Sequence, residues 1–174
     1  MTIEFPAGMT LRHPQEDDHP RVHALLDRWW GGLGGDAGSQ QRVLLLPRLY
    51  FQHFTTTSYL LERADGELTA FLIGFLSQSD PAVAYIHFVG VDPAFRMQGI
   101  ATALYSRFFE QARQLSRRYV NCLTSPENLT SQAFHARMGF RSLPGADIGG
   151  VQVQPGYDGV GLDRVVFTLD LAIS

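Results

Sequence analysis

The chain contains no lysine and a single cysteine, and both absences exclude kinds of chemistry. All 14 basic side chains are arginines. A Schiff base to pyridoxal phosphate, a Walker A phosphate loop and a lysine general base therefore cannot occur on this chain. Cys122 has no second cysteine with which to form an internal disulfide, and a Cys-rich zinc site is excluded. We therefore expect a reducing compartment and no bound metal.

Long apolar runs and an excess of positive charge are missing as well. No stretch reaches the roughly 18 consecutive apolar residues of a membrane-spanning helix, and no basic segment followed by an apolar run marks a secretion signal. The 14 basic and 17 acidic side chains give a formal net charge of −3, which supplies no cationic field for a nucleic-acid backbone. We expect a soluble, cytoplasmic protein with neither a nucleic-acid nor a membrane partner.

Length and hydrophobic periodicity predict one α+β domain over residues 1–174. The 174 residues are 45% hydrophobic and 18% charged, which suits a single compact core. The apolar spacing predicts, in chain order, a strand at 9–13, helices at 19–30 and 39–54, strands at 58–63, 67–76 and 84–91, a helix at 100–115, a strand at 119–123, a helix at 130–138, and strands at 140–143 and 163–171. The glycine-rich segments 31–38 and 144–161 are predicted to be a mobile loop and a long excursion. This order favours a central mixed, mostly antiparallel sheet of about seven strands flanked by about four helices.

The most informative stretch runs from the strand at 84–91 into the helix that begins at Ile100. The first amides of a helix have no intrahelical partner, and Gly99 allows an anion to approach the backbone closely. The amides from Met97 to Ala101 can therefore bind phosphate oxygens without a lysine, and Arg96 adds a permanent positive charge. The alternative is a purely structural turn in which Gly99 serves only the backbone conformation.

Two blocks of sequence carry a resemblance to a known family. The first block is Arg96-Met97-Gln98-Gly99-Ile100-Ala101, and the second runs from Asn128 to Phe140. They resemble the acetyl-CoA motif Arg/Gln-x-x-Gly-x-Gly/Ala and the later Asn-to-Gly-Phe segment of the GNAT superfamily of N-acetyltransferases. The resemblance implies acetyl-CoA as co-substrate and transfer of its acetyl group to a primary amine of a small molecule or peptide.

The resemblance also implies roles for individual residues. Residues Arg96 to Ala101 would hold the pyrophosphate, and Val89 and Val91 would offer backbone groups to the pantetheine arm. Asn128 and Ser131 would contact the cofactor. A splay between the strands at 84–91 and 119–123 would expose an amide near Val89 that stabilises the thioester oxyanion. A homodimer is frequent in the family.

Acetyl transfer needs a base more than an acid. An alkyl ammonium with a pKa of about 10.4 is the free amine only about once in 2,500 at pH 7, which is equivalent to roughly 4.6 kcal/mol. His87 is our candidate base, because alternation places it on the face of Val89 and Val91; the alternative is a buried packing residue. His135 stands where many relatives have a tyrosine that protonates the departing thiolate, and it is our candidate acid or else a packing residue.

The acceptor site is the least defined part of the prediction. Tyr157 and Asp158 are the polar candidates in the glycine-rich excursion, with an exposed loop as the alternative. The residue at 135 and the lack of a carboxylate in the strand at 84–91 leave open a second class of protein. That alternative is a non-catalytic acetyl-CoA-binding sensor or structural module. A longer acyl donor also remains open.

Overall fold

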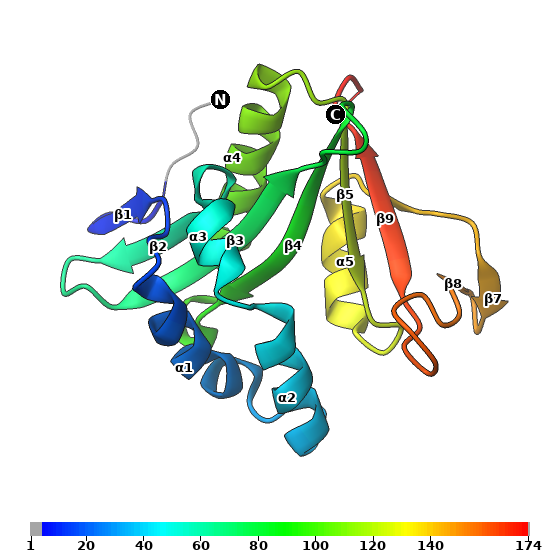
Figure 1. Cartoon of the computed structure of the whole chain (residues 1–174), viewed down its shortest axis with the longest axis horizontal. Coiled ribbons are helices and arrows are strands. Elements are labelled where there is room, and N and C mark those ends of the chain that lie inside the picture. The colour runs from blue at the N-terminus through cyan, green and yellow to red at the C-terminus, as the bar shows by residue number, and fades with distance from the viewer. Residues whose placement is uncertain (1–4, 174) are drawn as a thin grey trace. The chain divides into compact units, whose positions relative to one another are not determined.

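A computed structural model describes residues 5–173 of the chain, which divides into two compact units (Figure 1). The first unit comprises Met1–Phe75 and Ile86–Gln111, and the second comprises Leu76–Tyr85 and Ala112–Ser174. Strand β4 (Val83–Val91) passes from the second unit into the first.

Five α-helices and nine strands make up the regular structure of the described residues. The helices are α1 (Asp18–Trp30), α2 (Gly35–Leu45), α3 (Leu49–His53), α4 (Ile100–Gln114) and α5 (Leu129–Arg137), with two short 3₁₀ turns, η1 (Thr55–Thr57) and η2 (Pro93–Phe95). The strands are β1 (Met9–Arg12), β2 (Tyr59–Arg63), β3 (Leu68–Leu76), β4, β5 (Tyr119–Thr124), β6 (Arg141–Ser142), β7 (Ala146–Ile148), β8 (Val151–Val153) and β9 (Val165–Asp170).

The main sheet has seven strands in the hydrogen-bonded order β1-β2-β3-β4-β5-β9-β6. The pairing of β4 with β5 is parallel and runs from Val83 opposite Tyr119 to Tyr85 opposite Asn121. The pairs β1–β2, β2–β3, β5–β9 and β6–β9 are antiparallel. The prediction of an α+β fold with a mostly antiparallel seven-stranded sheet is confirmed.

In the first unit, helices cover both faces of the strands. Leu60 of β2 belongs to an apolar cluster with Val22, Leu26 and Trp29 of α1. The neighbouring Tyr59 points to the other face, where its hydroxyl meets Oε1 of Gln111 in α4 at 2.5 Å. Figure 1 shows α1 and α4 on opposite sides of these strands. Because both faces are covered, most side chains of β2 and β3 are buried.

The prediction of a loop over residues 31–38 is wrong at its second half, because α2 begins at Gly35. The reason is a close approach of two backbone segments. A Cβ at Gly38 would lie 2.4 Å from the carbonyl oxygen of Leu33, so only glycine fits there. The same carbonyl accepts a hydrogen bond from Nη1 of Arg42 at 2.6 Å. These contacts fold the glycine-rich segment into the start of a helix.

The single helix predicted over residues 39–54 is also wrong, because the structure divides it into α2 and α3. Leu46 ends α2 with φ −123° and ψ 62°, outside the helical region. The next residue is Pro47, which disfavours the helical conformation at the residue before it and has no amide to donate. The break leaves the carbonyls at the end of α2 without their usual helical partners.

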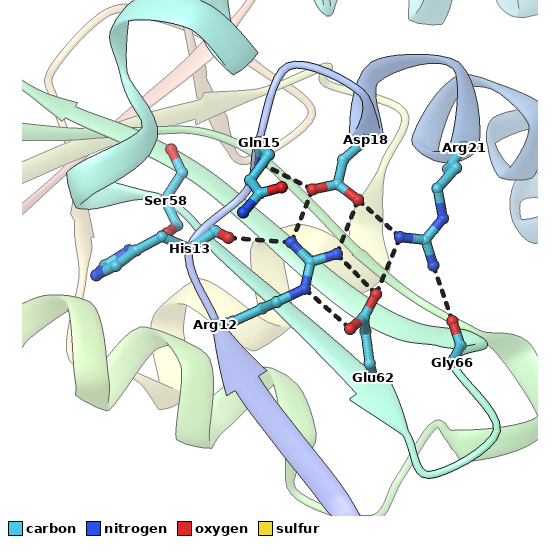
Figure 2. Close-up of polar contacts among 8 residues, drawn as sticks. All are labelled: Arg12, His13, Gln15, Asp18, Arg21, Ser58, Glu62 and Gly66. Carbon is cyan, nitrogen blue, oxygen red and sulfur yellow. Dashed lines mark hydrogen bonds and ion pairs between the residues drawn. The ribbon is translucent and has the colours of Figure 1, made fainter.

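A network of charged side chains ties β1, β2 and the start of α1 together (Figure 2). The guanidinium of Arg12 donates to both carboxylate oxygens of Asp18, at 2.7 and 2.8 Å, and to both of Glu62, at 2.9 and 2.7 Å. Arg21 contacts the same two carboxylates and donates to the carbonyl of Gly66 in the β2–β3 turn. The buried carboxylate of Asp18 thus joins the first turn of α1 to two strands.

In the second unit, β9 lies between β5 and β6, and α5 packs on it. The ring of His135 in α5 stacks on Phe167 of β9, with 4.8 Å between ring centroids. Cys122 of β5 is buried, and burial raises the pKa of its thiol, so we assign it a packing role. The excursion at 144–161 contains structure that the sequence did not predict, since β7 and β8 form a separate two-stranded hairpin.

Candidate functional site

Among the described residues, the turn that precedes α4 contains several backbone amides that meet no acceptor. Asp92 ends β4 and accepts a hydrogen bond from the amide of Ala94 at 2.9 Å, which starts η2. The hydrogen-bonded backbone of α4 begins with the amide of Ala103, which donates to Gly99 at 2.9 Å. Within residues 5–173, no acceptor meets the backbone amides of residues 97 to 101. The structure therefore contains the row of unpaired amides that the sequence predicts.

The conformation of this turn explains its sequence. Met97 and Gly99 both have positive φ, of 62° and 79°, and Met97 is 93% exposed. A Cβ at Gly99 would meet no heavy atom within 4 Å, so open space lies beside the backbone at this point. Positive φ at a methionine is strained, and such strain is common at binding sites. Glycine at 99 thus suits the positive φ and leaves open space beside the backbone, and the approach of an anion there stays a prediction.

The side chain of Arg96 is engaged by the protein itself. Its Nη2 donates to the carbonyl of Trp29 at 2.5 Å, and its Nε donates to the carbonyl of Val91 at 3.2 Å. The guanidinium therefore joins the last turn of α1 to the end of β4, where a cation also suits the helix dipole. Val89 and Val91 are half-buried in β4.

His87 lies in the same unit, against α2 and α3. Its Nε2 lies 2.5 Å from the carbonyl oxygen of Leu45, and its ring stacks on Tyr50 with 4.4 Å between centroids. Along β4 the alternation of burial breaks, since His87, Phe88 and Val89 are all half-buried. Burial therefore does not show which of these side chains share a face of β4. The placement of His87 on the same face as Val89 stays a prediction.

The candidate residues of α5 lie in the second unit. Asn128 caps the helix, because its Oδ1 accepts the amide hydrogen of Ser131 at 3.0 Å. His135 is buried, and its Nδ1 lies 2.7 Å from the carbonyl oxygen of Ser131. A carbonyl can only accept, so Nδ1 carries the hydrogen and Nε2 the lone pair in the neutral ring. Burial lowers the pKa of His135, and the bond to Ser131 offsets this only in part.

The two acceptor candidates differ in their surroundings. Tyr157 is 52% exposed in the loop after β8. The carboxylate of Asp158 accepts a hydrogen bond from Nε of Arg164 at 2.6 Å, and the Asp158 amide donates to Leu162. These contacts hold the loop together. Tyr157 and Asp158 belong to the second unit, whereas the turn before α4 belongs to the first unit.

The sequence did not predict that His87 would contact the ring of Tyr50 and the carbonyl of Leu45. Only the position of Pro47 signalled that a carbonyl nearby would lack a helical partner. Among residues 5–173, no three His, Cys, Asp or Glu side chains gather as metal ligands would. In the same part of the chain, no helix has the length and apolar character needed to cross a membrane.

Solved structures that share this fold include acetyltransferases. One is the diaminobutyrate acetyltransferase of Paenibacillus lautus in complex with L-2,4-diaminobutyric acid and coenzyme A, with a TM-score of 0.65, 23% identity, and coverage of 93% of this chain and 94% of that chain. Another is a putative acetyltransferase from Salmonella typhimurium with its cofactor acetyl-CoA, with a TM-score of 0.64, 17% identity and 94% coverage of each chain.

The sequence comparison assigns the family. Residues 20–140, more than half of the chain, match the acetyltransferase (GNAT) family, and the chain belongs to that family. The resemblance found in the sequence is thereby confirmed. The chain is also 30% identical over 84 residues to the L-2,4-diaminobutyric acid acetyltransferase of Virgibacillus pantothenticus, covering 48% of this chain and 52% of that protein. It spans about half, or less, of the length of the curated relatives it matches.

Proposed function

We propose that the protein is an N-acetyltransferase that moves an acetyl group from acetyl-CoA to a primary amine of a small molecule or peptide. The row of unpaired amides before α4 is the observation that carries the proposal. Family membership supports it, as do neighbours solved with coenzyme A or acetyl-CoA. The family match includes residues of both units, so we propose one acyltransferase domain over residues 1–174.

The residues present fit the acyl donor. The amides from Met97 to Ala101 would hold the pyrophosphate, with the helix dipole of α4 favouring its negative charge. Arg96 would add its charge while its Nε and Nη2 also bind backbone carbonyls. Val89 and Val91 would offer backbone groups to the pantetheine arm. Acetyl-CoA, once bound, supplies an activated thioester carbonyl.

Asn128 and Ser131 are also proposed to contact the acyl donor, but their existing hydrogen bonds restrict which of their atoms can do so. The Oδ1 of Asn128 is already occupied by the helix cap. Its side-chain amide nitrogen is therefore the group that would donate to the cofactor. The hydroxyl of Ser131 lies 3.2 Å from Nδ1 of His135, so a cofactor contact from Ser131 would share that hydroxyl.

His87 is the proposed general base, and His135 is the weaker of the two catalytic candidates. An acid must carry a proton on the nitrogen that meets the thiolate. In neutral His135 the hydrogen is on Nδ1 and is donated to the carbonyl of Ser131. Nε2 therefore gains a proton only in the imidazolium, which the lowered pKa of His135 disfavours. Coenzyme A thiolate, with a thiol pKa of about 8.5, can instead take its proton from water.

The buried, neutral state of His135 favours one alternative: an acetyl-CoA-binding module without chemistry. Calorimetry with acetyl-CoA and a thiol-release assay separate the two functions. The amine panel should include L-2,4-diaminobutyric acid, the substrate bound to a structural neighbour, and a peptide with a free amino terminus. An enzyme binds acetyl-CoA and releases coenzyme A with at least one amine. Binding without release on every amine would establish the alternative, and a donor longer than acetyl is tested in the same assay.

A matched pair of variants tests the anion-binding turn. Asp and Asn both tolerate positive φ, and they differ in one negative charge. We expect Gly99→Asp to weaken acetyl-CoA binding about 10- to 100-fold relative to Gly99→Asn, because two phosphates would face a carboxylate at short range. Equal affinities for the two variants would place the pyrophosphate away from this turn. Calorimetric titration of both variants makes the comparison.

We also propose residues that contact the acceptor amine, an oligomeric state and a cellular location. Tyr157 and Asp158 are proposed acceptor contacts, with Asp158 shared with Arg164. A homodimer is proposed and is tested by light scattering. The cytoplasm is the proposed location, because the single cysteine suits a reducing compartment.

A further inference from the structure

The end of α2 presents backbone carbonyls to histidine side chains. The amide of Leu46 donates to Val43, and Pro47 has no amide, so the helix stops with Leu45 and Leu46 carbonyls lacking their usual partners. His87 from β4 meets the oxygen of Leu45 through Nε2 at 2.5 Å. An imidazole thus takes a position that a backbone amide holds in a continuing helix.

The same pattern repeats one residue later. Nε2 of His23 lies 2.5 Å from the carbonyl oxygen of Leu46, and Nε2 of His19 lies 3.2 Å from it. A carbonyl oxygen has no hydrogen to give, so each of these nitrogens is the donor. Three imidazoles therefore share one tautomeric preference, set by the end of one helix.

Tyr50 fixes the plane of the His87 ring. The two rings are stacked with an interplanar angle of 15°. Tyr50 is itself held by Phe54 and Phe75, at centroid distances of 5.2 and 6.4 Å. Rotation of His87 about its side-chain bonds would break both the Leu45 hydrogen bond and this stack.

We propose that the Leu45 carbonyl and the Tyr50 ring hold His87 as its Nε2–H tautomer, so that Nδ1 takes the proton from the acceptor amine. Tyr50 is a positioning residue in this arrangement. The inference deepens the proposed function and rests on it.

The proton balance of the step is as follows. Nδ1 of His87 accepts one proton from the acceptor ammonium, and the free amine attacks the thioester carbonyl. A C–N bond forms and the C–S bond breaks as coenzyme A leaves. The thiolate takes its proton from water, and the second amine proton and the proton held on His87 both pass to water. The products are the amide, the free thiol and one released proton.

The surroundings of His87 also stabilise the imidazolium formed in that step. Its Nε2–H already donates to a carbonyl at the C-terminal end of α2, where the helix dipole favours positive charge. The face of Tyr50 attracts a cation that lies parallel to it. Both contacts remain in place when the ring takes up a proton.

The tautomer can be measured without any substrate. In ¹⁵N-labelled protein at a pH where His87 is neutral, we expect its Nε2 to show the chemical shift of a protonated nitrogen and Nδ1 that of an unprotonated one. His87→Gln identifies the signals by their loss. The opposite assignment, with hydrogen on Nδ1, would overturn the inference whatever the activity.

Kinetics then test Tyr50 with a conservative variant. Tyr50→Leu removes the aromatic face, and we expect kcat to fall about tenfold with the KM for acetyl-CoA unchanged. Tyr50→Phe keeps the ring and should restore kcat to near the wild-type value. Equal kcat for the Leu and Phe variants, or a change confined to KM, would contradict the positioning role. Assays well below the melting temperature of each variant exclude unfolding.

Failure of the proposed function has a different signature. If the wild-type chain binds acetyl-CoA but releases no coenzyme A with any amine, then the N-acetyltransferase proposal fails, and the base role with it. If transfer occurs and the ¹⁵N shifts place the hydrogen on Nδ1, then only the further inference fails.

Discussion

At the residue scale, most candidate side chains are already engaged by the protein. Arg96 binds two backbone carbonyls, Asn128 caps α5, and Asp158 pairs with Arg164. The backbone amides of residues 97 to 101, in contrast, meet no acceptor within residues 5–173. The groups proposed to bind the diphosphate are therefore main-chain atoms, whose positions the side chains specify only indirectly.

His87 is the side chain on which turnover should depend most. We expect His87→Gln to lower kcat about 10²-fold or more without raising the KM for acetyl-CoA, because general-base catalysis typically contributes that much. His53→Gln, at an exposed histidine of α3, is the control and should leave kcat unchanged. Steady-state kinetics measure kcat and the KM for acetyl-CoA of both variants. An unchanged kcat in the His87 variant would remove this residue from the mechanism.

For His135 we expect a small effect on turnover and a larger one on stability. His135→Phe should keep kcat within about threefold of wild type if water protonates the thiolate. A fall of kcat by ~10² or more at unchanged acetyl-CoA KM would instead assign the acid role to His135. Thiol release measured beside thermal unfolding separates the two effects.

At the scale of the elements, we expect the network of Arg12, Asp18 and Glu62 to make the stability of the first unit depend on pH in the acidic range. Burial alone would raise the pKa of Asp18, but hydrogen bonds from Arg12, the Gln15 amide and Arg21 bring it below its ordinary value. The pKa of Glu62 is lowered, chiefly by its hydrogen bonds from Arg12. The network contributes its full stability above the ordinary values of 3.8 and 4.5.

Acidification should therefore remove this contribution in a defined direction. As pH falls below those ordinary values, the unfolded chain takes up protons first, and the stability is lost through the lower pKa values of the folded state. At pH 7 we expect Asp18→Asn to cost about 2 kcal/mol, since it breaks a largely buried pair. Glu16→Gln, in an exposed pair with Arg48, should cost less than about 0.5 kcal/mol. Urea unfolding measures both, and equal costs would show that the network is only a surface feature.

The glycine-rich start of α2 makes a second prediction at this scale. Gly38→Ala forces a Cβ against the carbonyl of Leu33 at 2.4 Å, and we expect a loss of about 2 kcal/mol in the free energy of unfolding. Gly35→Ala meets no atom within 4 Å but must adopt a φ of 60°, and should cost about 1 kcal/mol. Thermal melts of both variants give the comparison. If Gly38→Ala is no worse than Gly35→Ala, the close approach does not hold in solution.

These elements also show what the sequence could predict. The strands from β2 to β5 and helices α1, α4 and α5 follow from apolar spacing, and the structure places them close to the predicted bounds. The α2–α3 break follows from Pro47, a local signal that the continuous apolar pattern of residues 39–54 masks. The early start of α2 depends on the Leu33–Gly38 contact, which spacing does not reveal.

For the whole molecule, the sequence predicted the family and a row of unpaired amides before α4, but not how the candidate catalytic side chains are held. The motif from Arg96 to Ala101 specifies a local backbone conformation through six consecutive residues. Such a motif can be identified from the sequence alone. The bond between His87 and Leu45 joins residues 42 positions apart. Its existence depends on how α2 ends against β4, which follows from tertiary packing.

The proposed function depends on where the diphosphate of the acyl donor binds. Titration of ¹⁵N-labelled protein with coenzyme A, and in parallel with pantetheine, which lacks the diphosphate, tests this directly. We expect coenzyme A to move the amide resonances of Met97, Gln98, Gly99, Ile100 and Ala101 downfield and pantetheine to leave them in place. Unmoved resonances for these amides at saturating coenzyme A would contradict the account.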